Sequence, residues 1–324
     1  MKFSSPETSY VVVASSRNPF TPNRIAAGSH NHDKQAMEIS ELKSLAYWQA
    51  LCPGLTITEA KPIDQLSPPE PRSAIRQDEW ETCKELINEE GYFAYDSFYD
   101  PGLVESLADA FDRLDEANVP PIFSLVYDEV WELMHRLHPM IDDLVGDYWM
   151  LPAVWAWHVK ASNQTAFAPH RDQVREAAPD DEDHLDYLTI WIPLTDLNYL
   201  SSCMCVVPAS ADPDYDMGTK KVIVEDLQSI RMLQGKKGSV FCWTTGMIHW
   251  GTRQSSFGES RKSIGLCVQN PEAECFDPPP IDYSRPYDLN DRLSIIGQQI
   301  INYSREADDA VLKMASELII SESG

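Results

Sequence analysis

The chain has 324 residues, of which 43% are hydrophobic and 24% are charged, so it can bury a substantial core. Its formal net charge of -25 at pH 7 repels phosphate backbones and anionic lipid surfaces. This acidity argues against nucleic acid and against a membrane as partners.

No apolar run approaches the length of a membrane span, and the first six residues lack the apolar stretch of a signal peptide. The 7 cysteines form no CxxC pair, and most lie in apolar, strand-like runs. This pattern predicts buried reduced thiols and argues against a disulfide framework or a zinc site. We therefore expect a cytoplasmic protein, either a monomer or a homodimer.

Residues 1–72 are rich in Pro, Ser and Asn, and we expect them to form an N-terminal extension with one short helix near residues 38–50. From residue 73 the periodicity sharpens. It predicts helices over residues 77–90, 103–117 and 124–145, with Gly91 as the C-cap of the first. Residues 92–95 are predicted to form a short strand.

After the helices, the hydrophobic pattern changes to the period of two that is typical of strands. Further strands are predicted over residues 154–160, 187–194, 204–207, 239–243, 247–250 and 263–269, and two closing helices over 289–303 and 306–320. This order predicts a mainly β fold with bracing helices, a double-stranded β-helix of the jelly-roll, cupin-like kind. We assign residues 73–285 to this domain and residues 286–324 to C-terminal helices packed on its core.

The most informative stretch is His170-Arg171-Asp172, which follows Pro169 just beyond a predicted strand. Residues two apart in an extended segment project to the same side, so His170 and Asp172 can point at one atom. Two imidazoles and one carboxylate form the facial triad of non-haem Fe(II) oxygenases, which leaves metal positions open for a co-substrate and dioxygen. The rival triplet His184-Leu185-Asp186 lies in an acidic run typical of a solvated loop, so we favour the first triplet.

His249, in an aromatic and apolar segment, is the candidate third ligand, although a lone histidine there can equally be a core residue bonded to a carbonyl. Downstream, strand alternation places Arg261 and Ser263 on one face. A guanidinium beside a hydroxyl can hold a carboxylate, as bound 2-oxoglutarate requires. Arg253 is a rival for this role, but its loop position favours exposure to solvent.

Three features stay open at this point. Thr189 and Trp191 share one face of the strand at 187–194 and could wall the co-substrate pocket, although core packing explains Trp191 equally well. His158 can face that pocket or form a hydrogen bond in the core. The acidic loop 176–186 can be a lid, can favour a cationic substrate, or can simply be solvated.

In order along the chain, these segments resemble the phytanoyl-CoA dioxygenase-like family of Fe(II)/2-oxoglutarate oxygenases. The resemblance rests on His170-x-Asp172, the strand 188–196, the segment 203–210, His249, Arg261-x-Ser263, and Gly91-Tyr92-Phe93 after a helix. It spans roughly residues 75–270. The family's Pro-Gly-Ser-His turn is Pro208-Ala209-Ser210-Ala211 here, and Ser201-Ser202 replaces its Asn-Gly. We interpret both departures as variation in a loop at the mouth of the barrel.

The resemblance implies Fe(II) held by His170, Asp172 and His249, and 2-oxoglutarate gripped by Arg261 with Ser263 and bordered by Trp191. It implies that 2-oxoglutarate and O2 are converted to succinate and CO2 while an unactivated C–H bond of a small-molecule metabolite is oxidised. Related halogenases replace the carboxylate ligand with a small residue, so Asp172 implies hydroxylation. Desaturation or oxidative cyclisation in natural-product biosynthesis is the alternative with the same cofactors. A non-catalytic jelly-roll protein that binds a metal or a small molecule is the alternative from another class.

Overall fold

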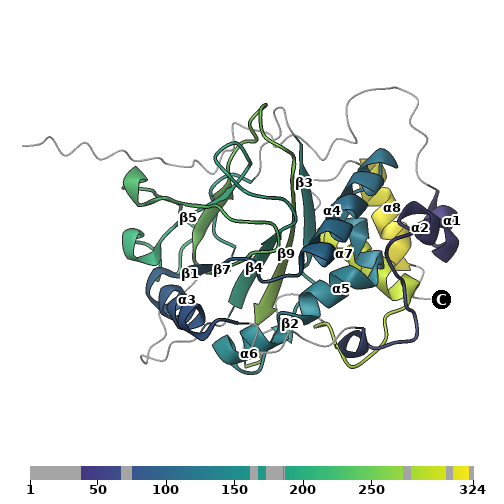
Figure 1. Ribbon diagram of the computed structural model, residues 1–324, viewed down its shortest axis with the longest axis horizontal. Coiled ribbons are helices and arrows are strands. Elements are labelled where there is room, and N and C mark those ends of the chain that lie inside the picture. The colour runs from purple at the N-terminus through teal and green to yellow at the C-terminus, as the bar shows by residue number, and fades with distance from the viewer. Residues whose placement is uncertain are drawn as a thin grey trace, which may run out of the picture.

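The computed structural model describes residues 38–66, 75–160, 167–172, 185, 187–272, 279–303 and 309–320. Two antiparallel β-sheets form its centre, and helices brace one side of the larger sheet (Figure 1). The predicted jelly roll with bracing helices is confirmed.

The larger sheet has the strand order β1-β7-β4-β9-β2, and β3 also pairs with β9. Its strands are β1 (Tyr92–Tyr95), β2 (Trp149–Met150), β3 (Trp155–Val159), β4 (Tyr187–Pro193), β7 (Val240–Thr244) and β9 (Arg261–Gln269). The smaller sheet has the order β6-β5-β8, with β5 (Met204–Val207), β6 (Arg231–Leu233) and β8 (Ile248–Gly251). All of these strand pairs are antiparallel.

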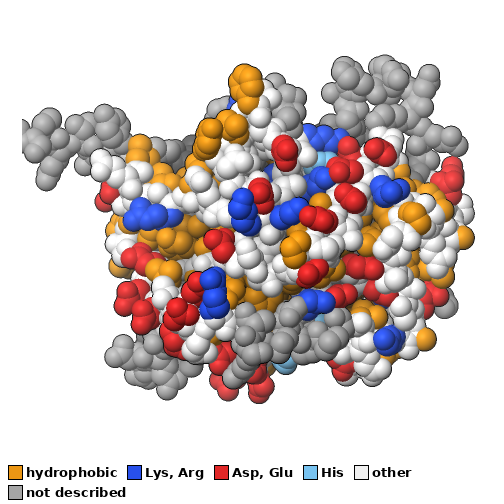
Figure 2. Space-filling view, viewed as in Figure 1, with side chains coloured by type: hydrophobic (Ala, Val, Ile, Leu, Met, Phe, Trp, Pro, Cys, Tyr) orange, Lys and Arg blue, Asp and Glu red, His pale blue; other side chains and the backbone are white. Residues whose placement is uncertain are grey.

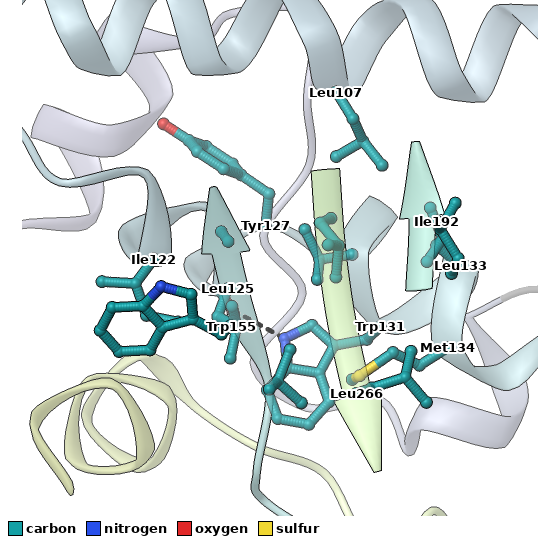
Figure 3. Close-up of a cluster of buried hydrophobic side chains, with 14 of the residues drawn as sticks. Leu107, Ile122, Leu125, Tyr127, Trp131, Leu133, Met134, Trp155, Ile192 and Leu266 are labelled. Carbon is teal, nitrogen blue, oxygen red and sulfur yellow. Dashed lines mark hydrogen bonds between the residues drawn. The ribbon is translucent and has the colours of Figure 1, made fainter. Parts of the chain in front are cut away.

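The central strands β4 and β9 are buried on both faces, and the two faces carry different side chains. Alternate apolar residues, such as Ile192 and Leu266, pack on the helical side against Trp131 and Leu133 (Figure 3). The opposite face carries Trp191 and, with Phe241 and Trp243 of β7, contributes to a second cluster shared with β5. This inner face also carries Arg261 and Ser263 of β9.

The helices are α1 (Ile39–Leu42), α2 (Leu45–Leu51), α3 (Gln77–Glu90), α4 (Pro101–Glu116), α5 (Asp128–His135), α6 (His138–Val145), α7 (Leu289–Asn302) and α8 (Asp309–Ile320). Helix α3 ends at Gly91, which has a left-handed φ of 77° and turns the chain into β1. An added Cβ there would lie 2.5 Å from the Met247 side chain, so glycine is required for space as well as for conformation.

Residues 38–66 and the C-terminal helices share the core of the helical layer. Trp48 is fully buried, stacks on Phe123 with ring centroids 5.7 Å apart, and donates its indole N–H to the Leu42 carbonyl. Arg292 of α7 is also buried and bonds to Asp128 of α5 at 2.7 Å. The same guanidinium donates to the carbonyls of Thr58, Val126 and Tyr287, so it joins three parts of the chain.

Some predicted elements need correction. The helix expected over 124–145 is wrong as a single unit: a 3-10 turn (Pro121–Val126) is followed by α5 and then α6. Pro139 lies in the first turn of α6, where its ring and missing N–H are tolerated, and it could not lie in the middle of one long helix. The helix expected over 38–50 is divided because Ser44 caps α2. Strands β2 and β6 were not predicted.

The six cysteines in the described ranges are all buried free thiols, as expected, while Cys275 lies outside those ranges. Among the helices of the described ranges, we find none with both the length and the apolarity needed to traverse a lipid bilayer.

Candidate metal centre

The structure brings His170, Asp172 and His249 together, although 76 residues of chain separate Asp172 from His249. One potential ligand atom from each lies within 4.8 Å of the other two. The Oδ1 atom of Asp172 is 3.5 Å from Nε2 of His170 and 3.5 Å from Nε2 of His249. The three atoms thus face a common point, as a metal ion requires.

Backbone pairing sets this convergence. His249 lies in β8, which pairs with β5, and His170 forms a β-bridge to His249. The two residues exchange N–H to carbonyl hydrogen bonds of 3.0 Å in both directions. The turn that carries His170 and Asp172 is therefore attached to the smaller sheet at the third ligand.

Both imidazoles are oriented by a carbonyl two residues earlier. Nδ1 of His170 lies 2.8 Å from the Ala168 carbonyl, and Nδ1 of His249 lies 3.1 Å from the Met247 carbonyl. Because a carbonyl can only accept, each Nδ1 carries a proton, and the lone pair that a metal ion would use is the one on Nε2 of the neutral ring. Such carbonyl partners are the usual way in which metal-binding histidines are fixed.

The two histidines differ electrostatically. Burial lowers the pKa of His249 to about 4, so its ring is neutral at ordinary pH. Burial also opposes charge on His170, but the Asp172 carboxylate and the Ala168 carbonyl outweigh it and raise the pKa of His170. Burial disfavours the Asp172 anion too, yet His249, His170 and Thr189 hold the pKa of that carboxyl well below its ordinary value. The site therefore keeps an anionic carboxylate ready for a cation.

Thr189 contacts this carboxylate directly. Its hydroxyl, on the inner face of β4, donates to Oδ2 of Asp172 at 2.7 Å. This bond leaves Oδ1 directed at the two imidazoles. Thr189 therefore orients the predicted carboxylate ligand, and its place in the wall of the co-substrate pocket stays a prediction.

Arg261 begins β9 on the same inner face and is 3% exposed. Its Nη1 donates to the carbonyl and hydroxyl oxygens of Ser202, at 3.2 and 3.1 Å, and its guanidinium lies 5.4 Å from the Trp191 ring centroid. Burial lowers the pKa of Arg261 to about 10. Among the described residues, no carboxylate lies within ion-pair distance of it.

Three buried donors on this face have no hydrogen-bond partner in the described ranges: Nε of Arg261, Oγ of Ser263 and Nε1 of Trp243. Unsatisfied buried donors are rare and costly, and a ligand that supplies acceptors is a common reason for them. An anionic ligand beside Arg261 and Ser263 satisfies this need, so these residues fit the far carboxylate of a dicarboxylic keto acid.

Gly265 lies between Ser263 and Cys267 and is the one residue of β9 that is not fully buried. An added Cβ there would meet Trp191 at 3.6 Å, which is ordinary van der Waals contact. A single methyl group therefore fits beside Trp191 without displacing it, at a position of β9 between Ser263 and Cys267.

Other predicted residues are placed as follows. His158 pairs in register with Lys262, whose ammonium reaches Asp112 of α4, so it lies on the helical face of the sheet, away from the triad. Arg253 is exposed. The rival ligands His184 and Asp186, and all but Leu185 of the loop 176–186, lie outside the described residues.

The sequence reasoning did not identify Arg171, Asp212, Ser202 or Trp243. Arg171 and Asp212 form a fully buried ion pair next to the triad, and the Trp243 ring lies 4.9 Å from the ring of His249. The two departures from the family pattern could have pointed to Ser202 and Asp212. Ser202 contacts Arg261, and the turn 208–211 leads directly to Asp212. The interpretation of both as variation in a mouth loop stays a prediction, and the structure adds that the two segments contact Arg261 and Arg171.

A sequence model of the phytanoyl-CoA dioxygenase (PhyH) family matches residues 87–263, more than half of the chain. This range contains the triad, Arg261 and Ser263. No curated protein matches the chain.

Several solved structures have a similar fold. The epimerase SnoN from nogalamycin biosynthesis, described as non-haem and α-ketoglutarate dependent, is 18% identical over 65% of this chain and 96% of its own, with a TM-score of 0.48. The non-haem monooxygenase ThoJ is 15% identical over 74% of this chain and 99% of its own, with a TM-score of 0.49. HygX from Streptomyces hygroscopicus, solved with nickel and 2-oxoglutarate, is 13% identical over 61% of this chain and 87% of its own, with a TM-score of 0.42.

Proposed function

The chain belongs to the phytanoyl-CoA dioxygenase (PhyH) family, and from that membership we propose that it hydroxylates an unactivated C–H bond of a small-molecule metabolite. As a member it is an iron- and 2-oxoglutarate-dependent oxygenase. The co-products in this proposal are succinate and carbon dioxide. We further propose that residues 73–285 form the catalytic domain, between an N-terminal extension (1–72) and C-terminal helices (286–324). The proposed setting is cytoplasmic, as a monomer or homodimer, without nucleic-acid or membrane partners.

The observation that carries the proposal is the convergence of His170, Asp172 and His249. Two imidazole nitrogens and one carboxylate oxygen suit Fe(II), and such a set of three would leave the ion free to take a co-substrate and dioxygen. When bound, iron and 2-oxoglutarate supply the activation of dioxygen. The protein's own contribution is to hold these three ligands, with Thr189 fixing the carboxylate. Because one of the three predicted metal ligands is the carboxylate of Asp172, we expect hydroxyl transfer to the substrate.

In this proposal, Arg261 and Ser263 bind the far carboxylate of 2-oxoglutarate. Among the described residues, the Nε–H of Arg261 and the hydroxyl of Ser263 have no hydrogen-bond partner, so both donors would gain a hydrogen bond from the carboxylate. Trp191, which lies against Arg261, borders the chain of the keto acid. Desolvation around Arg261 strengthens its attraction for an anion.

The test is succinate release from 2-oxoglutarate with ferrous iron added, in the wild type, His170→Ala and His184→Ala. We expect the wild type to release succinate, His170→Ala to lose at least about 100-fold because a metal ligand is gone, and His184→Ala to retain most of the rate. Loss in His184→Ala with retention in His170→Ala would mean that the other triplet binds the metal. A wild type that binds 2-oxoglutarate but never releases succinate would identify a non-catalytic binding protein.

A further inference from the structure

The residue between two of the predicted metal ligands points away from them and into the protein. Arg171 and Asp212 have side chains that are each 1% exposed, and they form a two-pronged ion pair, with Nη1 to Oδ2 at 2.6 Å and Nη2 to Oδ1 at 3.0 Å. Resting on the function proposed above, we propose that this pair is a positioning brace that holds the two ligand-bearing segments together and thereby sets the metal affinity.

The brace reaches both segments. Arg171 lies in the turn that carries His170 and Asp172, and its Nη1 also donates to the carbonyl of Gly246. The next residue, Met247, supplies the carbonyl that orients the ring of His249. One guanidinium therefore connects the turn of two ligands to the backbone that directs the third.

A further contact fixes the guanidinium itself. Its Nε donates to the carbonyl of Lys221 at 3.0 Å, and Asp212 also accepts from the backbone N–H of Asp214 at 3.1 Å. The planar group is thus held at four oxygens from three segments, an arrangement that lysine cannot reproduce. Such hydrogen-bonded arrangements behind metal ligands set ligand orientation and affinity.

Stability alone is a weak reason for this pair. The free-energy cost of burying two charges is about as large as the gain from their attraction, so apolar replacements of similar volume are often tolerated. Removing one partner alone is strongly destabilising, because it leaves a buried charge without compensation. The chain offers a matched control in the buried pair Arg292–Asp128, which joins α7 to α5 and contacts no residue of the triad. Both pairs join an arginine to an aspartate, and both are buried. Only the Arg171–Asp212 pair connects segments that carry predicted metal ligands.

The experiment measures Co(II) affinity of the metal-free protein by its visible absorption, together with the melting temperature. The test variants are Asp212→Asn, Arg171→Lys and the double variant Arg171→Met with Asp212→Leu; the control variants are Asp128→Asn and Arg292→Met with Asp128→Leu. We expect each folded test variant to bind Co(II) about 10- to 100-fold more weakly. Asp128→Asn should lower the melting temperature, because it leaves Arg292 buried without its partner. Both control variants should leave Co(II) affinity within about twofold of wild type, because their pair holds no ligand segment.

The double variant separates positioning from folding, since its apolar side chains remove the uncompensated charge. If it melts near the wild-type temperature and still binds Co(II) weakly, the brace is supported. Wild-type affinity in the double variant or in Arg171→Lys would overturn it, as would an equal loss in the control pair. Failure of the wild type to bind Co(II) at all would overturn the metal centre itself, and with it the proposed function.

Discussion

At the scale of single residues, the two predicted histidine ligands compete differently with protons. His249 is neutral through ordinary pH because burial lowers its pKa to about 4. His170 has a raised pKa because Asp172 favours its charged form. A metal ion needs both rings unprotonated, so the proton that must leave when the metal binds comes from His170.

This asymmetry predicts a single-proton pH dependence of metal affinity. As pH falls below the raised pKa of His170, the apparent affinity of the metal-free protein for Co(II) should fall about tenfold per pH unit. Titrations between about pH 5 and pH 8 check this, since an unperturbed histidine titrates near the middle of that range. A slope of two protons would contradict the lowered pKa of His249, and a flat profile would contradict the raised pKa of His170.

The convergence of His170, Asp172 and His249 could be predicted because the residue types suit a metal and the context of this HxD triplet favoured it over His184-Leu185-Asp186. Arg171 and Asp212 could not, because 40 residues separate them and a salt bridge leaves no periodic pattern. The contact of Thr189 with Asp172 could not be predicted either, for a related reason. Strand alternation gives the face of a side chain but not the atom that it touches.

At the scale of elements, β9 shows how a strand divides two tasks between its faces. Its apolar residues pack on the helices, while Arg261, Ser263 and the small residue Gly265 lie on the inner face. The period of two predicted this division. It could not predict β2 and β6, which have 2 and 3 residues and are too short to show a period.

Gly265→Val should separate co-substrate binding from folding. The added Cβ makes only ordinary contacts and valine suits a strand, so we expect a melting temperature close to wild type. The rest of the side chain would enter the space beside Trp191, so 2-oxoglutarate affinity should fall at least about tenfold, which corresponds to ~1.4 kcal/mol of binding free energy. Isothermal titration of the Co(II)-loaded protein with 2-oxoglutarate measures this. Gly265→Ala is the control, with a smaller loss, and unchanged affinity in the valine variant would place the keto acid elsewhere.

At the scale of the whole molecule, the net charge of -25 acts on the fold as self-repulsion. Acidic side chains are spread over the face seen in Figure 2, with fewer basic ones between them. Several of the ion pairs in the described ranges, including Lys236–Asp196, are exposed and contribute little against this repulsion. The net charge can be calculated from composition alone, because it does not depend on how the chain folds.

Salt should therefore stabilise the protein. Raising NaCl from about 0.1 M to 1 M shortens the screening length from about 10 Å to about 3 Å, which weakens repulsion between neighbouring carboxylates. For a chain of 324 residues, a gain of about 1 kcal/mol corresponds to a melting temperature higher by about 1.5 °C. Thermal unfolding followed by circular dichroism in NaCl and in KCl checks this, because screening depends on ionic strength and not on the cation. The same rise in both salts is expected. A falling melting temperature would mean that the exposed ion pairs, which salt also weakens, contribute more to stability than the repulsion removes.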